Sequence, residues 1–152
     1  MPWAGSLEQQ FDPDKMLREL RKAFVGFSDH GGEASSGTFT TIATGNWGCG
    51  AFGGYVDLKA VLQWMAASMA GRPVRYYPFK DPIHGRLEQL VLAVEAAPSG
   101  AVTVGWLWDK LVEFPLVIRA TAPAGTAPEF VTWLATQVLA LSSGGGGGDG
   151  AE

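Results

Sequence analysis

The stretch ATGNWGCGAFGG, residues 43–54, decides how this chain is interpreted. Five of its twelve residues are glycine, and Trp47, Cys49 and Phe52 stand between them. This glycine loop follows a β-branched strand candidate, TFTTIAT at 38–44, and precedes a helical pattern over 55–70. Glycines have no Cβ, so they let an anion approach the free N–H groups at the start of a helix. The stretch therefore predicts a binding site for a phosphate or diphosphate.

The patterns on both sides of the glycine loop predict an α/β fold. PVRYYPF at 73–79 is a second strand candidate, and strand, loop, helix and strand in this order indicate a βαβ unit with a parallel sheet. Asp12-Pro13 opens a helix, and further helices are expected over 83–96, 103–114 and 127–141, with a linker around 121–128. Two strands leave open sheet edges, so we expect self-association or pairing with a missing N-terminal part of the domain.

The glycine loop also satisfies the dinucleotide pattern G-x-G-x-x-G at Gly48, Gly50 and Gly53. In that interpretation Asp81, just after the second strand, would bind a ribose of an NAD-type ligand. Its spacing from Gly53 is longer than the usual ~20 residues. An NAD-type site and a purely structural glycine turn both remain open on the pattern alone.

Composition excludes several classes of function. The chain has 152 residues, a net charge of −4 and one cysteine, which rules out an internal disulfide and favours a reducing, intracellular location. No apolar run is long enough for a membrane helix, so no membrane partner is expected. Lys15 through Lys22 is interpreted as a solvated helix face and His30 as a surface residue, and His84 is expected at the start of a helix. We expect no metal and no cofactor.

Longer segments resemble the poly(ADP-ribose) glycohydrolase family. The segments that carry this resemblance are ATGNWGCGAFGG followed by LKAVLQWMAAS, the preceding FDPDKMLRELRKAFVGF, the following GRPVRYYPFKD, and a partial match in VTVGWLWDKL. The resemblance covers residues 9–114 and implies the C-terminal part of a catalytic domain with a partial macrodomain-like fold, a small parallel sheet flanked by helices. Residues 115–141 are then an unassigned helical extension, and 142–152 a disordered glycine-rich tail.

The resemblance also implies a substrate and a set of contacts. The family hydrolyses ribose–ribose O-glycosidic bonds in poly(ADP-ribose), so poly(ADP-ribose) or ADP-ribose is the expected partner, in the nucleus or cytoplasm. Phe52 would lie beside the distal ribose and Phe79 near the adenine side. The residues implied to bind the diphosphate are Asn46, Trp47, Gly48, Cys49, Gly50 and Ala51.

Two departures from the family pattern limit what this chain can do. Tyr55 stands where the family has Asp, which puts the N-cap of the next helix in doubt, with Asp57 two residues on. The family's catalytic Gly-Gly-Gly segment leading to Gln-Glu-Glu is missing from the sequence, so no catalytic residue is assigned. The expectation is a chain that is inactive alone or, alternatively, a non-catalytic ADP-ribose-binding module.

Other candidates for chemistry are interpreted as structural. Glu88, Glu95 and Glu113 are expected on wet helix surfaces. Cys49 is not expected to act as a nucleophile, because the sequence offers it no base. Trp106 and Trp108 cannot share one helix face, so one is expected in the core and the other exposed at an interface.

Overall fold

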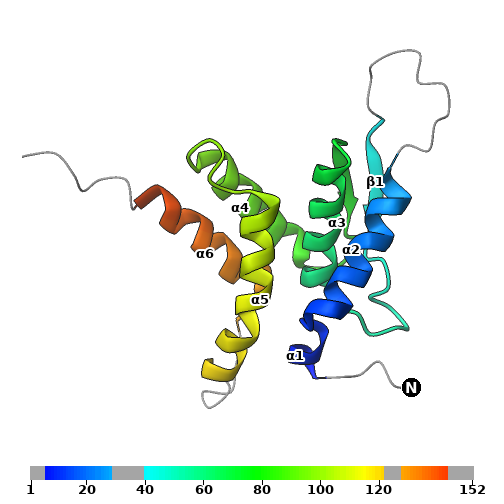
Figure 1. Cartoon of the computed structure of the whole chain (residues 1–152), viewed down its shortest axis with the longest axis horizontal. Coiled ribbons are helices and arrows are strands. Elements are labelled where there is room, and N and C mark those ends of the chain that lie inside the picture. Colours follow the sequence, from blue (N-terminus) through cyan, green and yellow to red (C-terminus); the bar gives the residue numbers. More distant parts are fainter. Residues whose placement is uncertain (1–5, 29–39, 122–127, 144–152) are drawn as a thin grey trace, which may run out of the picture.

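The computed structural model of the chain describes residues 6–28, 40–121 and 128–143 (Figure 1). His30, the start of the predicted first strand at 38–39, most of the predicted linker and the tail from 144 onward lie outside the described residues. The elements in chain order are α1 (Leu7–Gln10), α2 (Pro13–Phe27), β1 (Ile42–Gly45), α3 (Val56–Met69), β2 (Val74–Tyr77), α4 (Ile83–Ala96), α5 (Val104–Thr121) and α6 (Phe130–Ser143).

The predicted βαβ unit is present. β1 and β2 form a two-stranded parallel sheet in which Ile42 pairs with Val74 and Gly45 with Tyr77. α3 is the crossover between the two strands, as expected for parallel neighbours. The α/β class with a small parallel sheet flanked by helices is therefore confirmed. The carboxyl ends of both strands meet at Gly45 and Tyr77, which places the glycine loop at that edge.

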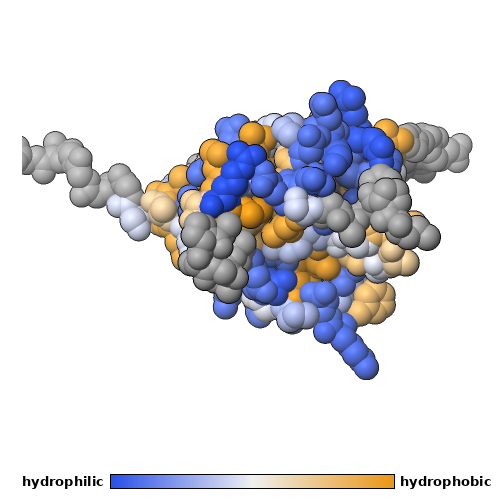
Figure 2. Space-filling model, turned by 90° about the horizontal axis from the view of Figure 1, so that it is seen from below, coloured by the Kyte–Doolittle hydropathy of each residue, from blue (hydrophilic) through white to orange (hydrophobic). Residues whose placement is uncertain are grey.

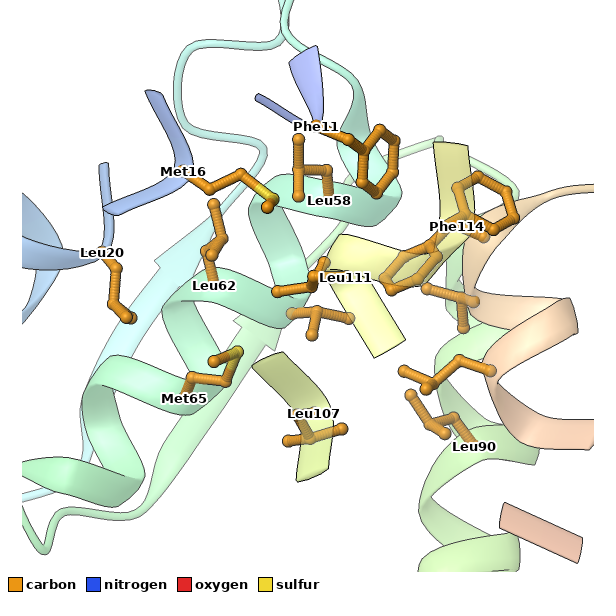
Figure 3. Packing of buried hydrophobic residues seen from close by; sticks show 14 of the residues in the cluster. Phe11, Met16, Leu20, Leu58, Leu62, Met65, Leu90, Leu107, Leu111 and Phe114 are labelled. Atoms are coloured by element: carbon orange, nitrogen blue, oxygen red, sulfur yellow. The ribbon is translucent and has the colours of Figure 1, made fainter. Parts of the chain in front are cut away.

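Helix α2 begins where the sequence predicts. Asp12 is its N-cap and accepts a hydrogen bond from the Lys15 backbone N–H at 3.1 Å, while Pro13 occupies the first helical position. Its apolar side faces α3: Met16 and Leu20 point toward Leu62 and Met65 (Figure 3). This packing fixes α2 beside the helix that follows the glycine loop.

Helix α5 joins the two parts of the core. Leu107, Leu111 and Phe114 are buried between α3 on one side and α4 with α6 on the other (Figure 3). Phe114 also belongs to a ring cluster with Phe11 and Phe130, with centroids 4.9–5.3 Å apart. Rings at this spacing contribute beyond their buried area.

Two expectations for this helix are wrong. The predicted end at 114 is too early, because the helix continues through Pro115 to Thr121. Proline removes one backbone donor, but Val117 and Ile118 beyond it pack against the core and offset that loss. Trp106 and Trp108 are also not divided between core and surface: both are half-buried and both pack on the core.

The start of α6 is tied to the start of α3. Asp57 is fully buried, and its Oδ2 accepts a hydrogen bond from the Val131 N–H at 2.9 Å. The Tyr55 hydroxyl accepts one from the Phe130 N–H at 3.0 Å. The other Asp57 oxygen pairs with Arg86 of α4 at 2.6 Å. Two residues at the start of α3, just after the glycine loop, thus satisfy the first free amides of the last helix.

Some apolar side chains remain exposed at the end of the molecule that carries α4 and α6 (Figure 2). They include Val91, Leu92 and Leu139, which are about half exposed. Hydrophilic side chains gather on the opposite half, the half that carries α2 in Figure 1. Apolar side chains are exposed in that half as well, among them Val25 of α2 at 58% and Phe52 of the glycine loop at 71%.

Candidate functional site

The glycines of the loop are subject to different structural constraints. Gly48 and Gly53 adopt φ of +73° and +64°, the left-handed region that favours glycine. A Cβ on Gly45 would lie 2.5 Å from the Tyr77 carbonyl oxygen, and one on Gly54 would lie 2.6 Å from the Gly48 carbonyl oxygen. These four glycines are required by the fold of the loop itself. A Cβ on Gly50 would meet no atom within 4 Å.

Two side-chain amides hold the beginning of the loop. Gln63 of α3 is buried, and its Nε2 donates to the Gly45 carbonyl at 3.0 Å. Asn46 donates from Nδ2 to the Pro78 carbonyl at 3.2 Å and accepts at Oδ1 from the Tyr76 hydroxyl at 2.8 Å. Asn46 therefore ties the loop to the end of β2.

A third amide holds the end of the loop. Gln10, at the end of α1, donates from Nε2 to the Gly53 carbonyl at 3.3 Å and accepts at Oε1 from the Tyr55 N–H at 2.7 Å. Tyr55 is the N-cap residue of α3, and its side chain makes no cap bond there. The doubt that Tyr raised about this cap is confirmed, and Gln10 binds the Tyr55 amide instead.

Several loop amides have no partner within the described chain. The Trp47, Cys49, Gly53 and Gly54 N–H groups donate to carbonyls inside the loop and its adjoining strand. Within the described residues, no hydrogen bond is formed by the N–H groups of Gly48, Gly50, Ala51 and Phe52. Gly50, Ala51 and Phe52 are exposed. Unpaired amides clustered in a turn form a concavity suited to an anion.

Three aromatic residues are candidates to contact a ligand: Trp47 and Phe52 within the loop, and Phe79 just after β2. Trp47 and Phe52 line a common cavity, and Phe52 is 71% exposed. Phe79 does not line that cavity; it lies near Gly45, is 86% exposed, and has a left-handed φ of +57°. A non-glycine residue in this conformation is strained, and such strain persists only where the surrounding structure holds the residue in place.

Cys49 is not set up as a nucleophile. Burial raises the pKa of its thiol to about 11; the charge of Lys59 acts in the opposite direction, and that of Asp81 in the same direction. A thiol with such a pKa is protonated at neutral pH, and the thiolate is the reactive form. Its Sγ lies 3.5 Å from the Trp47 carbonyl and donates to it. The structure thus gives Cys49 no catalytic activation.

A cavity of about 350 Å³ lies between α2, the start of α3 and the glycine loop. The loop contributes Trp47, Gly48 and Phe52 to its wall, together with Gly53 and Gly54. Burial on its own raises the pKa of Glu19 in this wall, but hydrogen bonds from Lys59 and Lys22 outweigh it, so that pKa lies below its usual value. Lys59 Nζ also lies 5.2 Å from the Trp47 ring centroid, which fixes the ring beside the loop.

Other predicted candidates lie away from the loop. Glu88 and Glu95 are exposed, as expected, whereas Glu113 is only partly exposed and pairs with Lys110 at 2.6 Å. Asp81 Oδ1 accepts from the Ile83 N–H at 2.9 Å, at the first residue of α4. His84 is exposed.

No group of three or more metal-ligating side chains occurs in the described part of the chain. None of the helices within 6–28, 40–121 and 128–143 is both long and apolar enough to cross a membrane.

The roles of Gln10 and Gln63, whose side-chain amides donate to carbonyls of the glycine loop, could not be predicted from the sequence. Gln63 sits in an apolar helix pattern, and a polar residue on the buried side of such a helix is the only available signal. Gln10 gave no such signal, because the residues it bonds, Gly53 and Tyr55, are 43 and 45 positions away in the sequence.

Comparison with known proteins gives one consistent result. Residues 3–85 match the family model described as Poly (ADP-ribose) glycohydrolase (PARG), Macro domain fold. "Probable poly(ADP-ribose) glycohydrolase 2" of Arabidopsis thaliana is 35% identical over 140 residues, which cover 69% of this chain and 26% of that protein. Poly(ADP-ribose) glycohydrolase 1 of the same plant is 45% identical over 74 residues, covering 48% and 13%.

A nematode relative belongs to the same group of proteins by name. Poly(ADP-ribose) glycohydrolase 1 of Caenorhabditis elegans is 32% identical over 104 residues, which cover 68% of this chain and 12% of that protein. The chain therefore spans about a quarter or less of the length of these relatives. The matched residues 3–85 include the whole glycine loop and both strands.

Proposed function

Because the chain belongs to the poly(ADP-ribose) glycohydrolase family, we propose that its glycine loop binds the diphosphate of ADP-ribose, free or as a unit of poly(ADP-ribose). The observation that carries the proposal is the set of unpaired amides at Gly48, Gly50, Ala51 and Phe52. Backbone N–H groups of this kind bind phosphate oxygens without a strongly basic protein surface. This suits a chain whose net charge is −4.

The remaining contacts are carried over from the family resemblance. Asn46, Trp47 and Cys49 are assigned to the diphosphate segment, with Asn46 acting through its bonds to β2. The family resemblance assigns Phe52 to the distal ribose and Phe79 to the adenine side, and both rings are exposed beside the loop, where they could cover a ligand. Exposed rings that flank a polar turn are typical walls of a nucleotide site.

We further propose that this chain binds its ligand without hydrolysing it. Cleavage of a glycosidic bond needs one carboxylic acid at the leaving oxygen and a second carboxylate at the reacting carbon. The sequence has no Gly-Gly-Gly segment leading to Gln-Glu-Glu. Incubation of the chain with poly(ADP-ribose) should therefore release no free ADP-ribose, and its release would refute this part of the proposal.

Two features favour ADP-ribose over an NAD-type ligand. The third glycine of the dinucleotide pattern normally permits close packing of helix on strand, but a Cβ on Gly53 would meet no atom within 4 Å. Asp81, the candidate ribose ligand, already accepts a hydrogen bond from the Ile83 N–H at the start of α4. Calorimetric titration with both ligands should show clear preference for ADP-ribose, and preference for NAD would overturn the assignment.

The test of the loop is a pair of matched valine substitutions. Gly48→Val places a β-branched side chain at φ +73° in the loop, and Gly71→Val places the same side chain at φ +66° after α3, outside the loop. Both carry similar backbone strain, of about 1–3 kcal/mol. We expect Gly48→Val to lose ADP-ribose binding and Gly71→Val to keep it. Equal affinity of the two variants would remove the loop from the site.

A further inference from the structure

The end of the glycine loop is held by residues from both ends of the chain. Tyr55 directly follows the last glycine of the loop, and its N–H donates to Oε1 of Gln10 at 2.7 Å. The hydroxyl of Tyr55 accepts from the Phe130 N–H at 3.0 Å. Tyr55 therefore connects the loop to α1 through its backbone and to α6 through its side chain.

The contact between Tyr55 and α6 lies in a packed aromatic cluster. The Phe11 ring centroid is 6.1 Å from that of Tyr55 and 5.3 Å from that of Phe130. Phe11 is 1% exposed and directly follows Gln10 in the sequence. A movement of the start of α6 would therefore disturb both residues that hold the end of the loop.

Two backbone hydrogen bonds connect this end of the loop to the proposed anion site. The Gly53 N–H donates to the Gly50 carbonyl and the Gly54 N–H to the Gly48 carbonyl, both at 3.0 Å. Within the described residues, the N–H groups of Gly48 and Gly50 are themselves unpaired. Amides that bind a phosphate must converge on it, so their geometry depends on the residues that support them.

The Tyr55 side chain serves α6 rather than its own helix. Tyr55 is the N-cap residue of α3, and its side chain makes no cap bond there. Asp57, two residues on, accepts from the Val131 N–H at 2.9 Å, so a second bond holds the same end of α6. All of α6, Phe130–Ser143, lies outside residues 3–85 that match the family model.

We propose that Tyr55 is a positioning residue of the diphosphate site. With α6 bound to its hydroxyl, Tyr55 fixes the end of the loop, and the end of the loop keeps the amides of Gly48 and Gly50 in the shape that binds a diphosphate. This role rests on the proposed function of the loop. Coupling between two sites is reciprocal, so a bound diphosphate must in turn favour the attachment of α6.

The test is a calorimetric titration of ADP-ribose into the native chain and two variants. Tyr55→Phe keeps the ring and removes the acceptor of the Phe130 N–H. The control, Val138→Ala, shortens a fully buried side chain further along α6 and leaves Tyr55 unchanged. Urea unfolding of all three proteins checks that they fold and ranks their losses of stability.

We expect Tyr55→Phe to bind ADP-ribose about fivefold more weakly than the native chain, at the lower end of typical coupling between sites. Val138→Ala should keep the native affinity, because it lies about two turns along α6 from the Phe130 amide. Hydrogen exchange of the Gly54 amide should be faster in Tyr55→Phe than in the native chain and unchanged in the control.

Hydrogen exchange in the native chain gives the reciprocal measurement. Saturation with ADP-ribose should slow exchange of the Phe130 amide by the same factor, about fivefold, and slow that of Ala140, near the other end of α6, much less. Stabilisation of the fold as a whole would instead slow both amides equally. This measurement needs no variant, so it tests the role of Tyr55 even if Tyr55→Phe does not fold.

The possible failures are distinguishable. If the native chain does not bind ADP-ribose, the proposed function is wrong, and the role of Tyr55 with it. If the native chain and Tyr55→Phe bind equally well, or if Val138→Ala loses as much affinity as Tyr55→Phe, Tyr55 does not position the loop. Equal slowing of exchange at Phe130 and Ala140 would show that the contact with α6 is only structural.

Discussion

Replacement of Asp57 by alanine should cost the protein a large part of its stability. Asp57 is fully buried and serves two elements at once, Arg86 of α4 at 2.6 Å and the Val131 N–H of α6 at 2.9 Å. Removing one partner of a buried pair costs about 3–5 kcal/mol. Arg86 keeps a second partner, Glu129 at 3.1 Å, so we expect the lower end, about 3 kcal/mol.

The assay is urea unfolding followed by circular dichroism. With a typical m of about 2 kcal/mol per molar, a loss of this size lowers the midpoint by about 1.5 M. Asp57→Asn should cost less, because the amide oxygen can still accept from Val131. The double variant with Arg86→Met should lose less than the sum of the two single variants, since it leaves no buried charge unpaired.

A surface pair provides the control. Glu113 and Lys110 lie three residues apart on α5, with Glu113 44% exposed, and Glu113→Ala should cost about 0.5 kcal/mol or less. A loss below about 1 kcal/mol for Asp57→Ala, or simple additivity with Arg86→Met, would refute the view that this pair joins three helices.

Two further predictions concern the loop itself. Gln63→Leu should remove one of the two hydrogen bonds to the Gly45 carbonyl, which keeps its bond from the Trp47 N–H, and should cost about 0.5–1.5 kcal/mol in urea unfolding. It should weaken ADP-ribose binding more than the core variant Leu134→Ala does, although that variant loses more stability; an equal or larger binding loss in Leu134→Ala would count against a positioning role. Cys49, with its pKa raised to about 11 by burial, should react slowly with iodoacetamide at pH 8, where about one thiol in a thousand is ionised. The rate should keep rising up to about pH 11 and should be much faster at pH 8 in urea; a plateau near pH 8.5 in the folded protein would contradict the raised pKa.

Local signals predicted the framework of the site well. The bounds expected for the helix at 83–96 are those of α4, and the expected βαβ unit and its glycine connection are present. These elements depend on apolar periodicity, on Asp12-Pro13 and on the glycine–proline stop after α3, all of which act within a few residues. The position of the glycine loop at the carboxyl ends of both strands follows from the same signals.

Contacts between distant residues could not be predicted. Tyr55 was expected to weaken the cap of its own helix, and the structure shows that its hydroxyl binds the start of α6, 75 residues away. The helix continues past Pro115 because the core on its far side favours it, which a local rule about proline does not include. The cations of α2 were interpreted as a solvated face, since no pattern reveals the loop that lies opposite them.

The contact between Gly54 and Gly48 has a consequence for the speed of recognition. The Gly54 N–H donates to the Gly48 carbonyl at 3.0 Å, so the turn closes on itself through its own backbone. A guest would meet a receptor that is already shaped, and the entropy of ordering the turn is spent during folding rather than during capture. Association should then be limited by encounter, and differences between ligands should be found in how slowly they leave.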